Sequence, residues 1–243
     1  MPKDRLRIGM LISGGGTTVE QIFIACMKGD LRGLAEPAVV ISSRRGAAGI
    51  RRMLDAGMDP RHVIVIRPRD FETPEEYGEA INRACDERGV DFLGQYGHLA
   101  KTPENVINHF PGMMVNQHPG PLDPRFPDFG GDGMYGLRVH CARIYYARAT
   151  GLDFWTEATA QRVAPEYDEG AVITRWSLPI QRFPRDTART LAAKLLPLEH
   201  ALHIHIIGMF ARGEDVICKK SERCLRFSYK IEPKSSENYK QRW

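Results

Sequence analysis

The chain has 243 residues, which is enough for one α/β domain to bury a full hydrophobic core without disulfides or structural metals. Its 42% hydrophobic and 26% charged residues are typical of a soluble globular protein and exclude a fibrous or disordered chain. A net charge of +4 suits anionic small molecules as well as nucleic acid. Because no aromatic-basic RNA-binding motif accompanies that charge, we expect no nucleic-acid partner.

Strands and helices alternate along the first half of the chain. An apolar strand over 7–12 ends at a glycine loop over 13–18, and residues 19–28 have helical spacing. Further strands are expected at 38–41, 62–66, 92–95 and 113–116, with helices at 47–56 and at 74–88, the latter with Thr73 as N-cap. The alternation predicts the α/β class, with a doubly wound, mostly parallel sheet covered on both faces.

The pattern changes after Pro119. Residues 118–133 are rich in proline and glycine and too long for a plain connector, which favours a functional surface loop. Beyond this loop we expect a helix at 136–149, strands at 157–163 and 171–178, and a long helix at 187–211. A single domain over 1–213 is therefore predicted, followed by a polar C-terminal tail over 214–243.

The cysteines and the N-terminus bear on location. The five cysteines are scattered and form no Cys-x-x-Cys pair, which favours reduced thiols over a disulfide framework or a zinc site. The first apolar run, 8–12, has strand length and is too short for a signal-peptide core or a membrane span. We expect a cytoplasmic protein with no membrane partner.

The glycine loop is a candidate phosphate site. Between a strand and a helix, glycine backbone N–H groups and the helix N-terminus can hold an anion. No Lys follows the last glycine as in a Walker loop, and the spacing differs from Gly-x-Gly-x-x-Gly, so a phosphate monoester fits better than ATP or NAD. The alternative is a tight turn that needs glycine only for its backbone angles. The candidate residues are Ser13, Gly14, Gly15, Gly16, Thr17 and Thr18.

Asn116 and His118 stand where a central strand ends, the edge at which open α/β sheets bind ligands. Two apart in a strand, they point to one face, and their N–H groups form a donor pair for the oxyanion of a tetrahedral intermediate. Asp168, in a later turn, supplies a carboxylate that would hold the tautomer of His118 and favour its protonated form. Taken singly, each motif is more often a structural turn.

These pieces, in their order along the chain, resemble the folate-dependent formyltransferase family, and within it the phosphoribosylglycinamide formyltransferases. Residues 7–16 are similar to the family's first strand and phosphate loop, and 115–119 to its Asn-x-His-Pro strand end. Residues 167–173 resemble its aspartate turn, and 198–201 resemble part of its final helix. The resemblance runs from about residue 6 to residue 213 and leaves out only the tail.

The resemblance implies a formyltransferase-type Rossmann-like fold and a formyl transfer from 10-formyltetrahydrofolate, the co-substrate, to the amine of a phosphorylated acceptor. Glycinamide ribonucleotide, in purine biosynthesis, would be that acceptor, with no metal and no covalent enzyme intermediate. Asn116 and His118 would stabilise the oxyanion, Asp168 would orient His118, and Glu199 would contact the acceptor's ribose. The implied folate-binding residues are Gly97, His98, Leu99, Ala100, Lys101, Glu166 and Tyr167. A homodimer is compatible with the resemblance.

Three stretches depart from the family's pattern. Gln161 stands where the family has the His of Gly-Thr-Ser-Val-His, and the loop after His118 reads Pro-Gly-Pro-Leu-Asp-Pro in place of Pro-Ser-Leu-Leu-Pro. Residues 98–100 replace Met-Arg-Ile in the pterin stretch. Formyl transfer is therefore better supported than the identity of the acceptor.

Other functions stay open. A formyltransferase could act on a different amine. A formyltetrahydrofolate hydrolase would use water instead; that family usually has an N-terminal regulatory domain, whereas this chain starts at the first strand. A non-catalytic folate- or nucleotide-binding module would not need the Asn116 and His118 donor pair. His200, His203 and His205 could suggest a metal, but only Glu199 could add a further ligand, so we expect packed or solvated histidines.

Overall fold

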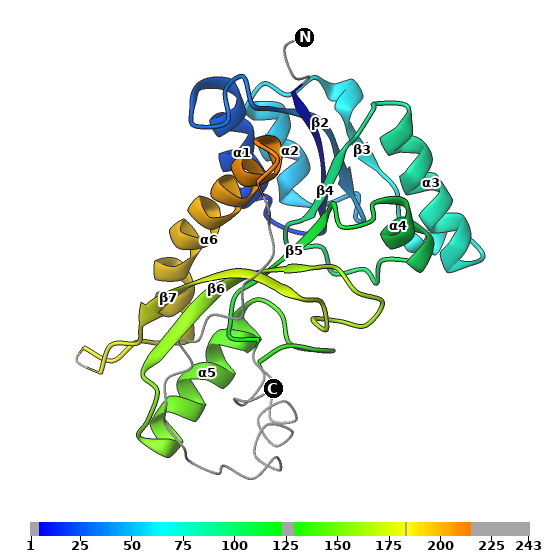
Figure 1. Cartoon of the computed structure of the whole chain (residues 1–243). Coiled ribbons are helices and arrows are strands. Elements are labelled where there is room, and N and C mark those ends of the chain that lie inside the picture. Colours follow the sequence, from blue (N-terminus) through cyan, green and yellow to red (C-terminus); the bar gives the residue numbers. More distant parts are fainter. Residues whose placement is uncertain (1–4, 123–128, 183, 215–243) are drawn as a thin grey trace.

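The computed structural model describes residues 5–122, 129–182 and 184–214. Seven strands form one sheet in the order β3-β2-β1-β4-β5-β6-β7 (Figure 1). Strands β1 to β5 are parallel, and β6 is antiparallel to both β5 and β7. The strands are β1 (Leu6–Ile12), β2 (Ala35–Ser42), β3 (Val63–Val65), β4 (Phe92–Gln95), β5 (Met114–His118), β6 (Trp155–Arg162) and β7 (Val172–Pro179).

Helices cover both faces of the sheet, as Figure 1 shows. Helices α1 and α6 contact each other on one face, and α3 and α4 contact each other on the other face. The helices are α1 (Thr17–Lys28), α2 (Ala48–Asp55), α3 (Pro74–Asp86), α4 (Glu104–His109), α5 (Leu137–Thr150) and α6 (Ala188–Ala211), with 3-10 turns at Pro60–His62 and Pro68–Asp70. The predicted doubly wound, mostly parallel α/β fold is confirmed.

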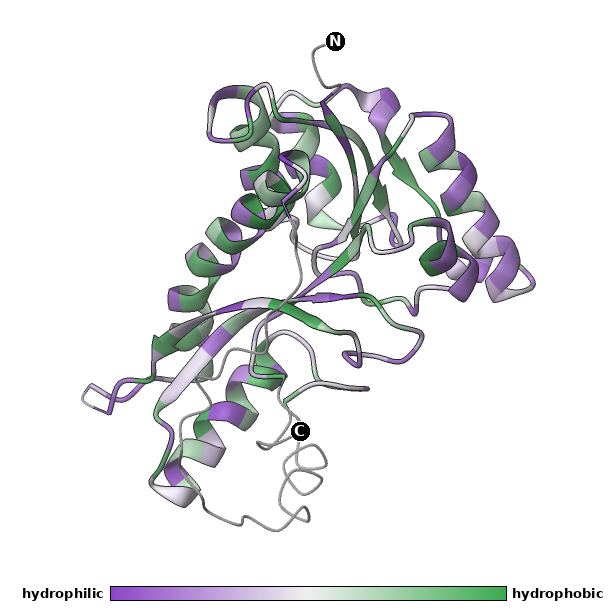
Figure 2. Ribbon diagram, in the orientation of Figure 1, coloured by the Kyte–Doolittle hydropathy of each residue, from purple (hydrophilic) through white to green (hydrophobic). Residues whose placement is uncertain are grey.

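The buried strands explain this layering. In β1, Ile8, Met10 and Ile12 join the core beneath α1 and α6, whereas Leu11 joins the core beneath α3. Successive side chains of a strand point to opposite faces, so an unbroken apolar run is stable only where both faces are covered. Figure 2 shows the matching pattern, with hydrophobic residues along the central strands and hydrophilic residues on the outer faces of the helices.

The element boundaries agree with those expected to within a few residues. The Thr73 hydroxyl accepts a hydrogen bond from Glu76 N at 3.1 Å, as expected of an N-cap, and Thr187 begins α6 with a capping box. Helix α4 was not predicted, because six residues are too few to show a helical period. Residues 215–243 of the predicted tail and residues 123–128 of the long loop lie outside the described residues.

Two features of the sheet position the candidate site. The glycine loop, residues 96–102 and the long loop follow β1, β4 and β5 at the shared carboxyl edge, where open sheets bind ligands. The turn between β6 and β7 brings Asp168 back to Asn116 on β5. Over the described part of the chain, no helix is both long and apolar enough to cross a membrane.

Candidate active site

A cavity of about 550 Å³ opens beside the ends of β4 and β5. Its walls come from these strands, the β6–β7 turn, the start of α5 and the middle of α6. Asn116, His118 and Asp168, the three residues predicted to carry the chemistry, all line it. The volume lies in the range of small-molecule sites.

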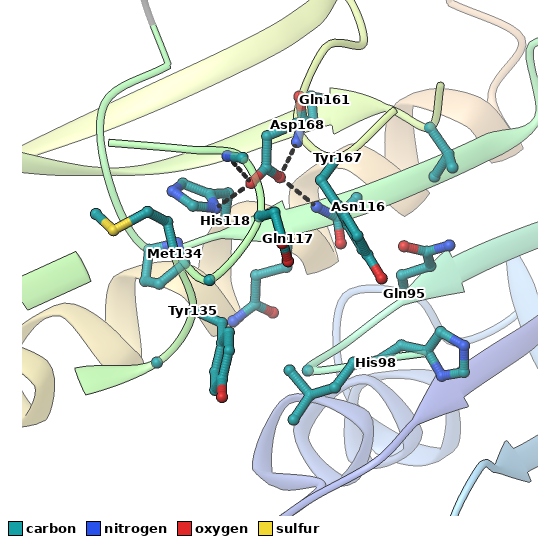
Figure 3. Close-up of a pocket in the computed structure, with 18 of the residues that line it drawn as sticks. Gln95, His98, Asn116, Gln117, His118, Met134, Tyr135, Gln161, Tyr167 and Asp168 are labelled. Atoms are coloured by element: carbon teal, nitrogen blue, oxygen red, sulfur yellow. Dashed lines mark hydrogen bonds and ion pairs between the residues drawn. The ribbon is translucent and has the colours of Figure 1, made fainter. Parts of the chain in front are cut away.

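The Asp168 carboxylate accepts three hydrogen bonds and contacts His118 (Figure 3). Its Oδ1 accepts hydrogen bonds from Asn116 Nδ2 at 3.3 Å and from Gln161 Nε2 at 2.6 Å. Its Oδ2 accepts one from Gly131 N at 2.9 Å and lies 3.4 Å from His118 Nδ1. Hydrogen bonds to a carboxylate are stronger than neutral ones, so this set fixes the position of the Asp168 side chain.

The backbone around Asp168 is tightly constrained. Asp168 has φ of 62°, in the left-handed region that Asp tolerates better than most residues. Two residues later, a Cβ on Gly170 would lie 1.7 Å from the carbonyl oxygen of Arg162, so only glycine fits there. The turn therefore holds the carboxylate in one place, and the three hydrogen bonds to it compensate the backbone strain.

His118 is almost fully buried, with 3% of its surface exposed. Its Nε2 lies 2.9 Å from the carbonyl oxygen of Phe129, and because a carbonyl can only accept, that nitrogen carries a proton. Its Nδ1 faces Asp168, so both ring nitrogens face groups of the protein. For His118 to donate to a substrate oxygen, that oxygen must take the place of the Phe129 carbonyl.

His140 is a cavity residue that the sequence did not single out. It lies on α5, is buried, and lines the cavity. Burial, and secondarily the nearby charge of His118, lower the pKa of His140 to about 4. Its ring is therefore neutral near pH 7 and adds no positive charge beside His118. No motif marks this residue, which reaches the cavity only through tertiary packing.

Glu199, predicted to contact a ribose, lies on α6 and lines the cavity. It is 5% exposed, and burial raises the pKa of its carboxyl to about 7, an effect that a hydrogen bond with Gln117 opposes. Gln117 also lines the cavity and was not singled out in the sequence. Charged and neutral forms of Glu199 therefore coexist near pH 7.

The glycine loop lies beside the cavity rather than in its wall. Gly16 has φ of 68°, and a Cβ there would lie 2.6 Å from Gly49 Cα, so the tight-turn interpretation accounts for Gly16. It does not account for Gly14 and Gly15, which are exposed and have nothing within 4 Å of an added Cβ. Thr17 Oγ1 lies 3.3 Å from His200 Nε2, one residue from Glu199, so α6 links the loop to the cavity.

Six of the seven predicted folate-binding residues line the cavity; Ala100 does not. Lys101 Nζ and Glu166 Oε1 form an ion pair at 3.2 Å, which joins the loop after β4 to the β6–β7 turn. Leu99 and Tyr167 are about two-fifths exposed and offer apolar surface. The ring of His98 is directed away from the cavity in Figure 3, and burial lowers its pKa to about 4.

The histidines of α6 pack separately. His200 contacts Thr17, His203 packs edge-on against Tyr96 with ring centroids 5.2 Å apart, and His205 lies against Trp176. Within the described ranges, no three His, Cys, Asp or Glu side chains are grouped so that they could hold a metal ion.

Comparisons with known proteins agree with this geometry. The formyl transferase family model matches residues 6–207. A chloroplastic phosphoribosylglycinamide formyltransferase of Arabidopsis thaliana is 28% identical over 84% of this chain, which spans 65% of that relative's length. The Escherichia coli phosphoribosylglycinamide formyltransferase is 26% identical over 86% of this chain and 88% of its own.

Solved structures show the same similarity. The glycinamide ribonucleotide transformylase 1 of Symbiobacterium toebii superposes with a TM-score of 0.71 and 29% identity, over 86% of this chain and 89% of that one. The phosphoribosylglycinamide formyltransferase of Brucella melitensis gives a TM-score of 0.70 and 29% identity, over 86% and 96%. Because the family model covers most of the sequence and the fold agrees, the chain belongs to the formyl transferase family.

Proposed function

We propose that the protein transfers the formyl group of 10-formyltetrahydrofolate to the amine of glycinamide ribonucleotide. The observation that carries this proposal is the position of Asp168, bonded to Asn116 Nδ2 and 3.4 Å from His118 Nδ1 inside a cavity of substrate size. A module that only binds a ligand has no need of a buried carboxylate beside an amide and an imidazole.

In this mechanism the acceptor amine attacks the formyl carbon directly. One hydrogen of Asn116 Nδ2 bonds to Asp168, which leaves the second hydrogen for the developing oxyanion. His118 Nε2 supplies the other donor once the oxyanion displaces the Phe129 carbonyl, and Asp168, 3.4 Å from Nδ1, orients the ring. The bond from the formyl carbon to the folate nitrogen then breaks, the attacking amine loses a proton, and the folate nitrogen gains one.

The two substrates are assigned to different parts of the site, the folate to the cavity and the acceptor to Glu199 and the glycine loop beside the cavity. The folate would lie along the cavity-lining residues of 97–101 and against Glu166 and Tyr167. The acceptor would place its ribose at Glu199 and its phosphate on Ser13–Thr18, the loop joined to α6 through Thr17 and His200. This arrangement brings the amine of one substrate to the formyl group of the other near Asn116. We assign the catalytic unit to 1–213. We also assign the protein to the cytoplasm, where thiols stay reduced, because the described cysteines are all free.

The test is a formyl-transfer assay with purified full-length protein. Release of tetrahydrofolate is followed with and without a panel of phosphorylated and unphosphorylated amines that includes glycinamide ribonucleotide. We expect release only when an amine is present, and fastest with glycinamide ribonucleotide. Equal release without any amine would instead identify a hydrolase, and no release with any amine would identify a binding module.

A further inference from the structure

Three carboxamide side chains form a row across the cavity wall, which we call the carboxamide row: Gln95 on β4, Asn116 on β5 and Gln161 on β6. Gln95 is the register partner of Asn116, and Asn116 is the register partner of Gln161. Register partners on neighbouring strands lie on the same face of a sheet, and all three residues line the cavity. Figure 3 shows them following one another across the pocket.

The nitrogen end of each carboxamide is anchored. Asn116 Nδ2 and Gln161 Nε2 donate to Asp168, at 3.3 Å and 2.6 Å, and Gln95 Nε2 donates to the Thr102 hydroxyl. An amide whose nitrogen is fixed in this way presents its oxygen on the other side, where it can only accept. At Gln95 this places the amide oxygen, an acceptor, on the side away from Thr102.

One of these acceptors has no partner within the described residues. The Gln161 Oε1 is buried and has no hydrogen-bond partner there. Gln95 is only 7% exposed, and Figure 3 shows its oxygen on the side of Tyr167, facing the pocket. A buried acceptor without a donor destabilises a protein, and a site that keeps one discriminates against ligands that cannot supply the missing N–H or O–H group.

We propose that Gln95, held by Thr102, is a specificity-determining residue that accepts a hydrogen bond from the amino-pyrimidinone ring of the formyl donor. The inference rests on the proposed function, because it requires that ring to bind beside the loop after β4. Gln95 immediately precedes this loop, and its neighbour in the row is Asn116, where the formyl group would react. The 2-amino group and ring N–H of an amino-pyrimidinone are donors that match the amide oxygen of Gln95, which faces the pocket.

The experiment compares two ligands on two proteins. Titration calorimetry gives the Kd of 5,8-dideazafolate, a stable analogue with the 2-amino group, and of its 2-desamino form. One hydrogen bond predicts that wild-type protein prefers the amino compound by about 10-fold. Gln95→Met, similar in volume but without an acceptor, should lose this preference. Equal affinities in wild type, or an unchanged preference in the variant, would overturn the inference.

Two further variants make the comparison decisive. Gln21→Met makes the same chemical change on α1, away from the cavity lining, and should keep the wild-type preference. Thr102→Val frees the Gln95 amide and should reduce the preference, which provides a second test if Gln95→Met fails to fold by circular dichroism. If wild type binds neither compound, the proposed function and this inference both fail; if it binds both equally while transferring formyl groups, only the inference fails.

Discussion

Replacing Glu199 by Gln should stabilise the protein above neutral pH. Burial raises the pKa of this carboxyl from 4.5 to about 7, so folding favours its protonated form. Below pH 4.5 the group is protonated in both the folded and unfolded states. Between pH 4.5 and 7 the unfolded state loses the proton first, and the free energy of unfolding of the wild type falls as pH rises, by about 3 kcal/mol at 1.36 kcal/mol per pH unit.

Gln has nearly the same shape as Glu, can still bond to Gln117, and does not ionise. The variant should therefore exceed the wild type in free energy of unfolding by less than about 1 kcal/mol at pH 5 and by about 3 kcal/mol at pH 8. Urea unfolding followed by tryptophan fluorescence measures both values. Glu104→Gln, at an exposed position of α4, should show no such change between the two pH values. An equal difference at pH 5 and pH 8 would refute the reasoning.

Three other substitutions test separate features. Asp168→Asn should leave the free energy of unfolding in urea within about 1 kcal/mol of wild type and lower kcat at least about 100-fold, since an amide cannot accept all three hydrogen bonds. Unchanged kcat would remove Asp168 from the mechanism. Gly16→Ala should lower the free energy of unfolding by about 2 kcal/mol, because Gly16 has a positive φ and an added Cβ would clash with Gly49. Gly15→Ala should change the free energy of unfolding by less than about 0.5 kcal/mol. Equal effects of the two substitutions would contradict the close-approach argument. Thr187→Ala should lower the free energy of unfolding in urea by about 1 kcal/mol, because it removes the capping box of α6. An unchanged free energy of unfolding would show that the cap is not needed.

The layers of helices and strands could be predicted from the sequence, but the direction of every strand could not. Buried parallel strands are continuous apolar runs separated by amphipathic helices, and this pattern is legible without coordinates. Whether β6 and β7 run parallel or antiparallel leaves little trace in such a pattern. The short helix α4 was not predicted, because packing against α3 and not a helical period in the sequence makes it helical.

The candidate site was predictable only where strand geometry or a motif applied. The two-residue spacing placed Asn116 and His118 on one face, and the resemblance added Asp168. The contacts of Phe129 O with His118 and of Gly131 N with Asp168 come from backbone groups of a long loop, which no side-chain pattern reveals. The carboxamide row likewise depends on strand register, which is set by tertiary packing.

A single residue, Ser13, joins the loops that are assigned to the two substrates. Ser13 Oγ accepts a hydrogen bond from Leu99 N at 2.8 Å and lies 2.6 Å from Ser43 Oγ, while Ser13 N donates to Gly97 O at 3.1 Å. The first loop cannot open without breaking these bonds to the second. Amide hydrogens at Ser13 and Leu99 should therefore exchange with solvent together, and a molecule seated against either loop should slow exchange in both.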